Sequence, residues 1–234
     1  LELTTVSPQL NLADAGKSLE LLFAKAMTKG DGYEASASIS YKYAVGLGWL
    51  AGLASGPGGI WQATLRAIPC SSDGTTAPGT RSASAAVPAL PTSTELYRTA
   101  SVTVGGTALS RWADIGLEIN APAEPLYQGA DLHPRDVLLG GPAGLIAHDL
   151  SIAVEELDVA YNLAGLVGAE VTTVIVLKPL SRDGTLGAGS NITLTHYGTV
   201  QPAAPRGEAH GAASDALRIL GRYDGSHLPL TITV

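Results

Sequence analysis

Charged residues and cysteines are both scarce in this chain of 234 residues. Lysine, arginine, aspartate and glutamate together make up 15% of it, and a single cysteine, Cys70, excludes an internal disulfide framework. A surface with so few charges must be largely neutral, which suits a protein that spends its time in contact with copies of itself. An ordinary small domain can share this composition, so composition alone leaves both interpretations open.

The charge balance and the hydrophobic pattern exclude further classes. The net charge of −7 argues against tight electrostatic binding of nucleic acid, which needs lysine and arginine against phosphates. No apolar run reaches the roughly 20 residues that span a bilayer, and no basic segment followed by an apolar one opens the chain. We therefore expect a soluble protein that is made in the cytoplasm and has no membrane anchor.

The chain also lacks any grouping of residues that predicts a reaction centre. His148 and Asp149 are adjacent on an expected strand, so their side chains point to opposite faces and cannot act as a catalytic pair. Asp131, His133 and Asp136 could approach a metal ion, but a proline-rich loop with polar residues explains them more simply. The sequence thus predicts no catalytic residue, no cofactor and no metal site, and we expect a protein that is not an enzyme.

Histidine and tryptophan side chains are assigned to the interior on their pattern. His148 and His196 share their strand faces with apolar residues, which predicts that both imidazoles are buried. The three tryptophans, Trp49, Trp61 and Trp112, are not interleaved with basic residues. They are expected to be core or interface anchors rather than stacking platforms for bases.

Alternating and apolar runs predict about nine or ten β-strands. The candidate ranges are 34–45, 60–68, 95–104, 107–112, 114–120, 145–155, 171–177, 191–197, 216–223 and 228–234. The unbroken apolar run at 171–177 suggests a strand buried on both faces. The Gly105-Gly106 pair permits positive φ at both central positions of a tight turn, which predicts a hairpin there.

Two short helices and several irregular segments complete the prediction. Apolar spacing favours helices over 18–27 and 155–165, with a strand over 18–24 as the alternative for the first. The expected irregular segments are a glycine-rich break at 46–59, an extended loop at about 71–94, a crossover at 121–144 and a loop at 202–211. Residues 71–94 could equally form a long hairpin whose tip is Asp73-Gly74. The expected fold is a single mainly β domain over residues 1–234, a β-sandwich or part-open barrel with two short peripheral helices.

The order of these elements resembles that of a known family. Three stretches carry the likeness: ASVTVGGTALSRWADIGLEINAP (100–122), GLIAHDLSIAVEELDVAYNLAGLVGAEVTTVIVLKP (144–179), and the closing strands of 191–234 that begin NITLTHYGTV and end LTITV. They are similar to the hairpin, strand–helix–strand and closing strands of the tail tube (major tail) proteins of long-tailed bacteriophages. The likeness covers more than half of the chain, and the N-terminal part is similar in organisation only.

The resemblance implies a structural role in a tube. Subunits of this family form six-fold rings that stack into a tube, and each contributes hairpins to a shared barrel that lines the lumen. The strands at 145–154 and 114–120 are then candidates for the lumen barrel. The candidate lumen-facing residues lie on the polar face of the second strand and are Asp114, Glu118 and Asn120. The loop at 71–94 becomes the candidate contact between rings, with candidate residues Ser72, Asp73, Gly74 and Arg81.

The same resemblance implies partners and a location. The subunit would associate with itself and with the terminator, tape measure and distal proteins of a tail, in the virion, after synthesis in the host cytoplasm. DNA would pass through the lumen without specific binding, because an acidic wall repels phosphate. The alternatives are another structural virion protein, such as a tail terminator or a capsid decoration protein, a ligand- or carbohydrate-binding β-sandwich, or a β-rich hydrolase.

Overall fold

The computed structural model of the chain describes residues 3–4, 9–11, 19–23, 39–43, 45–83, 96–140, 146–155, 165–180, 184–187, 189, 191–201, 207–209 and 212–234. Every regular element within these residues is a β-strand. The first nine are β1 (Leu3–Thr4), β2 (Gln9–Asn11), β3 (Leu19–Phe23), β4 (Ile39–Tyr43), β5 (Gly46–Ser55), β6 (Gln62–Pro69), β7 (Gly79–Ala83), β8 (Tyr97–Val104) and β9 (Thr107–Leu109). The other nine are β10 (Trp112–Asn120), β11 (Ala123–Leu126), β12 (Asp136–Leu139), β13 (Ala147–Val154), β14 (Glu170–Pro179), β15 (Ile192–Gln201), β16 (Gly207–Ala209), β17 (Ala212–Gly221) and β18 (Leu230–Thr233).

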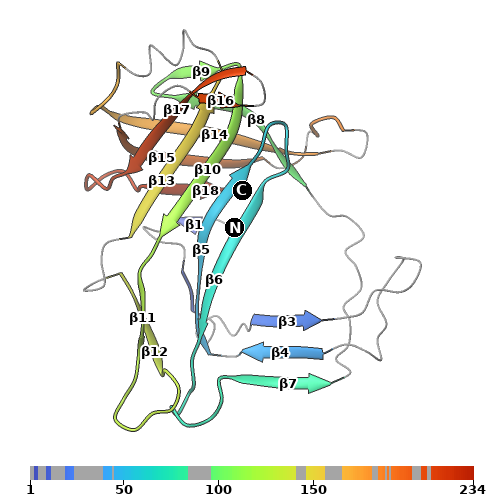
Figure 1. Cartoon of the computed structure of the whole chain (residues 1–234), viewed down its shortest axis with the longest axis vertical. Helices are drawn as coiled ribbons and strands as arrows, with labels where there is room; N and C mark the ends of the chain where they lie inside the picture. Colours follow the sequence, from blue (N-terminus) through green and yellow to red (C-terminus); the bar gives the residue numbers. More distant parts are fainter. Residues whose placement is uncertain are drawn as a thin grey trace.

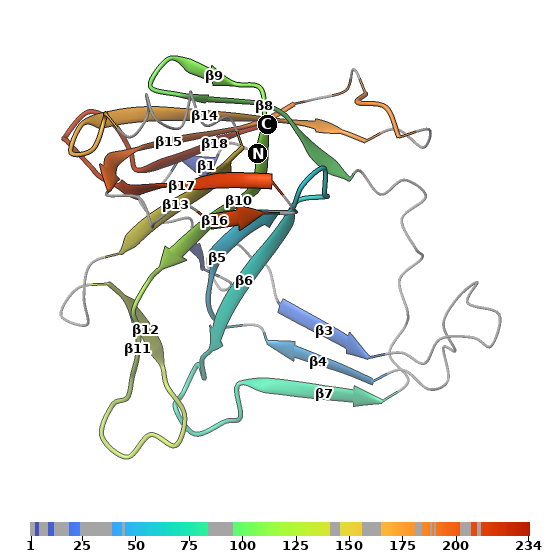
Figure 2. The ribbon, with the colours of Figure 1, turned by 45° about the horizontal axis from the view of Figure 1, so that its top comes forward.

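One sheet of thirteen strands dominates the structure (Figure 1). Its main path is β2-β5-β10-β13-β17-β15-β14-β8-β9, and β6, β16, β18 and β1 join this path from the side. Figure 2 shows the part with β8, β14 and β15 bending over the part with β5, β10 and β13. Because β-strands twist, a sheet this wide curls, and here it becomes an open half-barrel rather than a flat layer.

The inner face of the half-barrel holds the main hydrophobic core. Ile115, Leu117 and Ile119 of β10 and Leu150 and Ile152 of β13 are at most 4% exposed. They cluster with apolar side chains from β5, β8, β14, β15, β17 and β18. A fully buried side chain of this size contributes roughly 1.5–3 kcal/mol, so this face is the principal source of stability. The alternation predicted for β10 and β13 is confirmed.

Two smaller sheets lie away from this core, at the lower end of the view in Figure 1. β11 and β12 form a hairpin, and β3, β4 and β7 form a three-stranded sheet. The hairpin β8–β9 follows the prediction, because Gly105 and Gly106 have φ values of 55° and 83°.

The structure corrects the first expected helix. Residues 19–23 form β3, whose Leu19 pairs with Tyr43 and whose Phe23 pairs with Ile39 of β4. The strand alternative is therefore the right one here, because pairing with a neighbouring strand outweighs a weak local helix preference. The second expected helix, over 155–165, falls mostly on residues 156–164, which lie outside the described residues.

Other segments expected to be irregular are strands. The expected break at 46–59 contains the ten-residue β5, the crossover at 121–144 contains the β11–β12 hairpin, and the loop at 202–211 contains β16. β14 is buried on one face only, since Thr172 is exposed and Val174 and Val176 are half-buried. Solvent reaches its other face because, among the described residues, no second layer covers the outside of the half-barrel there.

Candidate assembly surfaces

The predicted lumen-facing residues share one exposed face of β10. Asp114, Glu118 and Asn120 are exposed, whereas the intervening Ile115, Leu117 and Ile119 are buried. The two-residue period of a strand produces this separation. The three polar residues thus lie together on the outer side of the half-barrel, as the alternation indicates. Whether that side lines a lumen stays a prediction.

Neighbouring strands add charges to this outer face. Asp149 of β13 lies opposite Glu118 in register, and Arg218 of β17 donates from Nε to both carboxylate oxygens of Asp149, at 3.0 and 2.8 Å. The hydrogen bonds to Asp149, and then the charges of Asp149 and Glu118, raise the pKa of Arg218. The guanidinium therefore offsets the repulsion between two carboxylates that face each other across the strand pair.

A shallow groove of about 510 Å³ crosses the same face, between β6, β5, β10, β13 and β17. Its floor is made of small residues, among them Gly52, Ala54, Gly116, Ser151 and Ala216. The Ser151 hydroxyl donates a hydrogen bond to the Gly116 carbonyl at 3.2 Å, so its proton is already used within the groove. The groove is a small-residue surface with Arg66, Glu118, Asp149 and Arg218 along it.

The strand β6 is an edge that sequence reasoning did not identify. Among the described residues it pairs only with β5, from Pro69 opposite Gly46 to Gln62 opposite Ala54. Residues 62–67 are all exposed, and Leu65 reaches 74%. Natural edges are commonly short, charged or covered, because an open row of backbone groups invites another strand. β6 is eight residues long and carries one charged side chain, Arg66.

A second exposed region, which we call the arm, consists of the β11–β12 hairpin with its loop 127–135 and the loop 71–78. In the loop 71–78, Asp73 accepts hydrogen bonds from the backbone N–H groups of Thr75 and Thr76, at 2.9 and 2.7 Å, and from the Thr76 hydroxyl at 2.7 Å. The bonds from Thr76, followed by those from Thr75 and Ser71, hold the pKa of Asp73 well below its usual range. The loop therefore has a defined shape of its own.

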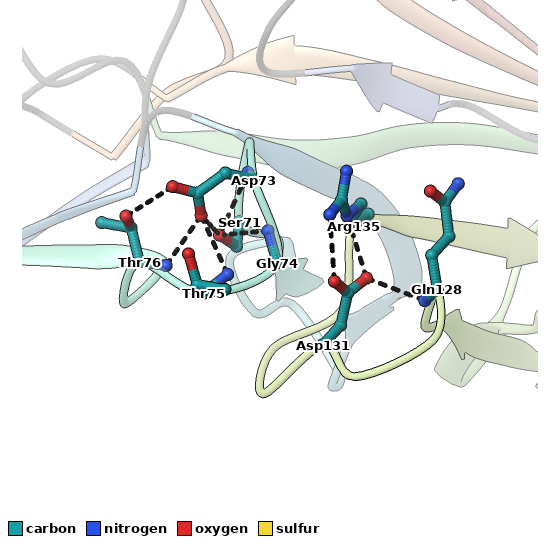
Figure 3. Close-up of polar contacts among 8 residues, drawn as sticks. All are labelled: Ser71, Asp73, Gly74, Thr75, Thr76, Gln128, Asp131 and Arg135. Carbon is teal, nitrogen blue, oxygen red and sulfur yellow. Dashed lines mark hydrogen bonds and ion pairs between the residues drawn. The ribbon is translucent and has the colours of Figure 1, made fainter.

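Each loop of the arm has its own set of polar contacts, which Figure 3 shows, and backbone hydrogen bonds join the two loops. The N–H groups of Leu132 and His133 donate to the Gly74 carbonyl at 2.8 and 3.0 Å, and Ser71 N–H donates to the Pro134 carbonyl at 2.8 Å. Gly74 has φ of 74°, and a Cβ placed on it would lie 2.1 Å from the Asp131 carboxylate. Only glycine fits this contact.

A salt bridge braces the second loop of the arm. Asp131 pairs with Arg135 at 2.9 Å and accepts the Gln128 N–H at 2.7 Å. The pKa of Asp131 is lowered mainly by its hydrogen bonds with the Arg135 side chain. At the tip, Leu132 is 74% exposed and Tyr127 is 56% exposed. Rigid loops that present apolar side chains are typical of contact surfaces.

The structure divides the residues predicted to contact a neighbouring ring. Ser72, Asp73 and Gly74 belong to the arm, with Ser72 exposed and Gly74 buried. Arg81 does not, because it lies on β7 and pairs with Tyr41 of β4. The expected continuous loop over 71–94 is therefore wrong at 79–83, and its residues 84–94 lie outside the described residues.

Buried polar side chains gather at one place in the core. His148 and His196 are 1% and 2% exposed, as predicted, and Thr173 is fully buried. Within the described part of the chain, none of their side-chain nitrogen or oxygen atoms has a hydrogen-bond partner. Such atoms are uncommon in native cores, so the cluster calls for a physical account.

Neither the candidate metal ligands nor the cysteine forms a reactive arrangement within the described residues. No group of three histidine, cysteine, aspartate or glutamate side chains in the described residues could hold a metal ion, and this includes Asp131, His133 and Asp136. Burial, followed by the charge of Asp136, raises the pKa of the Cys70 thiol, which disfavours the reactive thiolate. No helix of the described residues is long and apolar enough to cross a membrane.

Comparison with family models and with curated proteins finds no match for this chain. The functional argument therefore depends on the geometry above.

Proposed function

We propose that this chain is a structural subunit that assembles with copies of itself into stacked rings, as the tail tube of a long-tailed bacteriophage. The observation that carries the proposal is the long exposed edge of β6, which ends the antiparallel run β6-β5-β10-β13. A monomer gains nothing from such an edge, whereas a ring of subunits can pair it.

Addition of a strand from a second copy would satisfy this edge. The free backbone groups of β6 supply hydrogen bonds, and Leu65 supplies apolar contact area. Such a contact joins two different surfaces, so repeating it closes a ring when the rotation between copies fits. Each copy would add the β5–β6 hairpin and the β10–β13 pair to the barrel that the copies share.

The outer face of this run is suited to line a channel for DNA. Around the groove and along β10, the acidic residues Asp114, Glu118 and Asp149 outnumber the basic residues Arg66 and Arg218. An acidic wall repels phosphate, so DNA would pass without adhering. We propose Asp114, Glu118 and Asn120 as lumen-facing residues on this ground.

The arm would provide the contact between successive rings. It lies at the end of the half-barrel where β5 begins and β6 ends, far from the β5–β6 turn in Figure 1. Its loops are joined to each other by backbone bonds, and its apolar tip residues Tyr127 and Leu132 are free to meet another copy. Other tail proteins, the terminator, tape measure and distal proteins, would meet the same surfaces at the ends of the tube.

The tryptophans give the carbohydrate-binding alternative no comparable support. Trp49 is 6% exposed, and Trp61 is half-buried and donates from Nε1 to the Thr99 hydroxyl at 2.8 Å. Trp112 is also half-buried, and it packs against the main core as Trp61 does. A sugar platform needs an open aromatic face, whereas these side chains are engaged with the protein.

Negative-stain electron microscopy and light scattering across a concentration series test the proposal. The wild-type chain should form rings or hollow tubes of uniform width, with a mass that rises with concentration. Leu65→Lys places a charge on the exposed edge and should leave a folded monomer. Val167→Lys places the same charge at an exposed turn position away from β6, where the side chain is 46% exposed against 74% for Leu65, and this control should assemble normally. A wild-type chain that stays monomeric at every concentration contradicts the proposal.

A further inference from the structure

The buried cluster of His148, Thr173 and His196 joins three strands of the half-barrel. The side chains come from β13, β14 and β15, and each is at most 2% exposed. Five polar atoms are involved, both ring nitrogens of each histidine and the threonine hydroxyl, and none has a hydrogen-bond partner among the described residues. Burial of polar atoms without well-formed hydrogen bonds is unfavourable, so the cluster is a costly feature of the core.

The three side chains are neighbours. Thr173 and His196 lie opposite each other in the β14–β15 register. Gly221 of β17 lies against both imidazoles, because a Cβ placed on it would be 2.7 Å from the Cβ of His148 and 3.2 Å from Nε2 of His196. Gly221 pairs with Gly198, where a Cβ would lie 2.3 Å from the Leu220 carbonyl. Only glycine fits at either position, and this brings the two rings together.

Few charged groups act on this pair. On β10, β14, β17 and β18 the adjacent residues are Ile119, Thr173, Gly221 and Leu230, which carry no charge. Asp149 follows His148 on β13 and is bound by Arg218 on the outer face. Its charge raises the pKa of His196, but it is the smallest of the four influences on that pKa. The backbone of His148 and the charge of Asp149 favour protonated His196, but burial and the nearby His148 side chain are the larger causes and oppose it. For His148, burial alone disfavours the charged form.

We propose that His148 and His196 form an acid-sensitive latch across β13, β17 and β15, closed while both rings are neutral and opened when a ring is protonated. An imidazolium at this position would be a charge without a partner in an apolar core, next to a second titratable ring. Separation of β13, β17 and β15 at this point would let water reach both rings. The latch is independent of the assembly proposed above, because it lies within one copy.

The direction of the pH dependence follows from burial. Burial lowers the pKa of His148 to about 4, and burial together with the proximity of His148 lowers the pKa of His196 to about 4. An opened or unfolded state has the ordinary pKa of about 6.5. The neutral pair therefore contributes full stability above about pH 6.5, and that stability is lost as the pH falls toward 4. Between pH 7 and pH 4.5, the opening equilibrium should rise on the order of 50-fold for each histidine.

Native-state hydrogen exchange of dilute monomer tests the latch. Exchange of β13, β15 and β17 amides is measured from pH 7 to pH 4.5, corrected for the intrinsic rate, and compared with β5 and β6. The proposal predicts that, as the pH falls, amides of β13, β15 and β17 lose protection more steeply than those of β5 and β6. Urea unfolding midpoints over the same range should fall as well. Because ordinary carboxylates titrate near or below pH 4, most of this window belongs to histidine.

Variants identify the groups responsible. In His148→Phe and His196→Phe an apolar ring replaces one that makes no hydrogen bond, so folding should persist and the pH dependence should flatten. His133→Gln, in the arm, is the control and should keep the wild-type slope. An unchanged slope in both phenylalanine variants overturns the proposal.

Two further measurements keep the test decisive if the variants fail to fold. Proton NMR of the wild-type imidazole Cε1–H signals should show two histidines that stay neutral down to about pH 5 while the protein is folded. Titration of both near pH 6.5 in the folded protein overturns the latch. Slower amide exchange of β13, β15 and β17 on addition of Zn²⁺ alone at pH 7 would also overturn the proposal, because the cluster would then be a metal site.

Discussion

The adjacent strands β10 and β5 are paired in one sheet, yet their sequences differ in kind. β10 alternates strictly, with Ile115, Leu117 and Ile119 inside and polar residues outside. β5 reads GLGWLAGLAS and has three glycines in ten residues. Their register joins Ile115 to Ser55 and Glu118 to Gly52. The comparison shows that β10 is specified by its own side chains, whereas β5 is specified by the strands on either side of it.

Two glycines of β5 allow the backbones of neighbouring strands to come close to it. A Cβ on Gly52 would lie 3.1 Å from the Leu117 carbonyl, and one on Gly46 would lie 2.5 Å from the Ile68 carbonyl. β5 pairs with β6 along one side and with β2 and β10 along the other. It is thus a strand that joins the well-packed core to the exposed edge, and its small residues form part of the floor of the outer groove.

Removal of core volume from β10 should have the largest effect. Ile115→Ala removes a side chain that is 2% exposed and should lower the free energy of unfolding by about 2–5 kcal/mol. Leu65→Ala on β6 changes a residue that is 74% exposed and should cost less than about 0.5 kcal/mol. Urea denaturation of both variants measures the difference. Equal losses would mean that β6 is covered in the monomer.

Two glycines of β5 should respond differently to a methyl group. Gly46→Ala forces a contact with the Ile68 carbonyl at a φ of 146°, and should cost about 1–3 kcal/mol. At Gly52→Ala the Cβ lies 3.1 Å from the Leu117 carbonyl, so the cost should be below about 1 kcal/mol. Thermal unfolding gives the comparison. A harmless Gly46→Ala would contradict the close packing of β5 against β6.

The smallest effect is expected in the arm, which depends on hydrogen bonds rather than on buried volume. Asp73→Asn keeps the side-chain shape but removes the charge that the N–H groups of Thr75 and Thr76 favour, so exchange of those two amides should accelerate. Because the pKa of Asp73 is lowered, the wild-type carboxylate stabilises the loop above the ordinary pKa near 3.9 and ceases to do so as the pH falls below it. The control is Asp114→Asn on β10, which should leave exchange of the Thr75 and Thr76 amides unchanged. If both variants accelerate this exchange equally, the shape of the arm does not depend on the Asp73 carboxylate.

The sequence predicts the core strands well because their pattern is local. Alternation in 114–120 and 145–155 places Ile115 and Leu150 inside, and the burial of His148 follows from the same pattern. Strand order is not local. Nothing in the run Gln62–Pro69 indicates that it ends the sheet, so the exposure of Leu65 was not predictable.

Glycine, proline and short apolar segments account for the wrong predictions. Gly46, Gly48 and Gly52 read as a break, but all three lie in a strand, where Gly46 and Gly52 come close to neighbouring backbone carbonyls. Leu19–Phe23 is compatible with a helix face, and only its partner β4 decides for a strand. Of the candidate contact residues, Asp73 and Gly74 were recognisable as a turn, whereas the position of Arg81 on β7 depends on pairing with a distant segment.

Hydrogen exchange along residues 62–69, compared between dilute monomer and the high-concentration state, tests the central claim most directly. If β6 pairs with a strand of another copy, its amides should exchange rapidly in the monomer and become protected in the assembly, and Leu65→Lys should abolish the gain. Assemblies in which residues 62–69 exchange as fast as in the monomer would contradict the account.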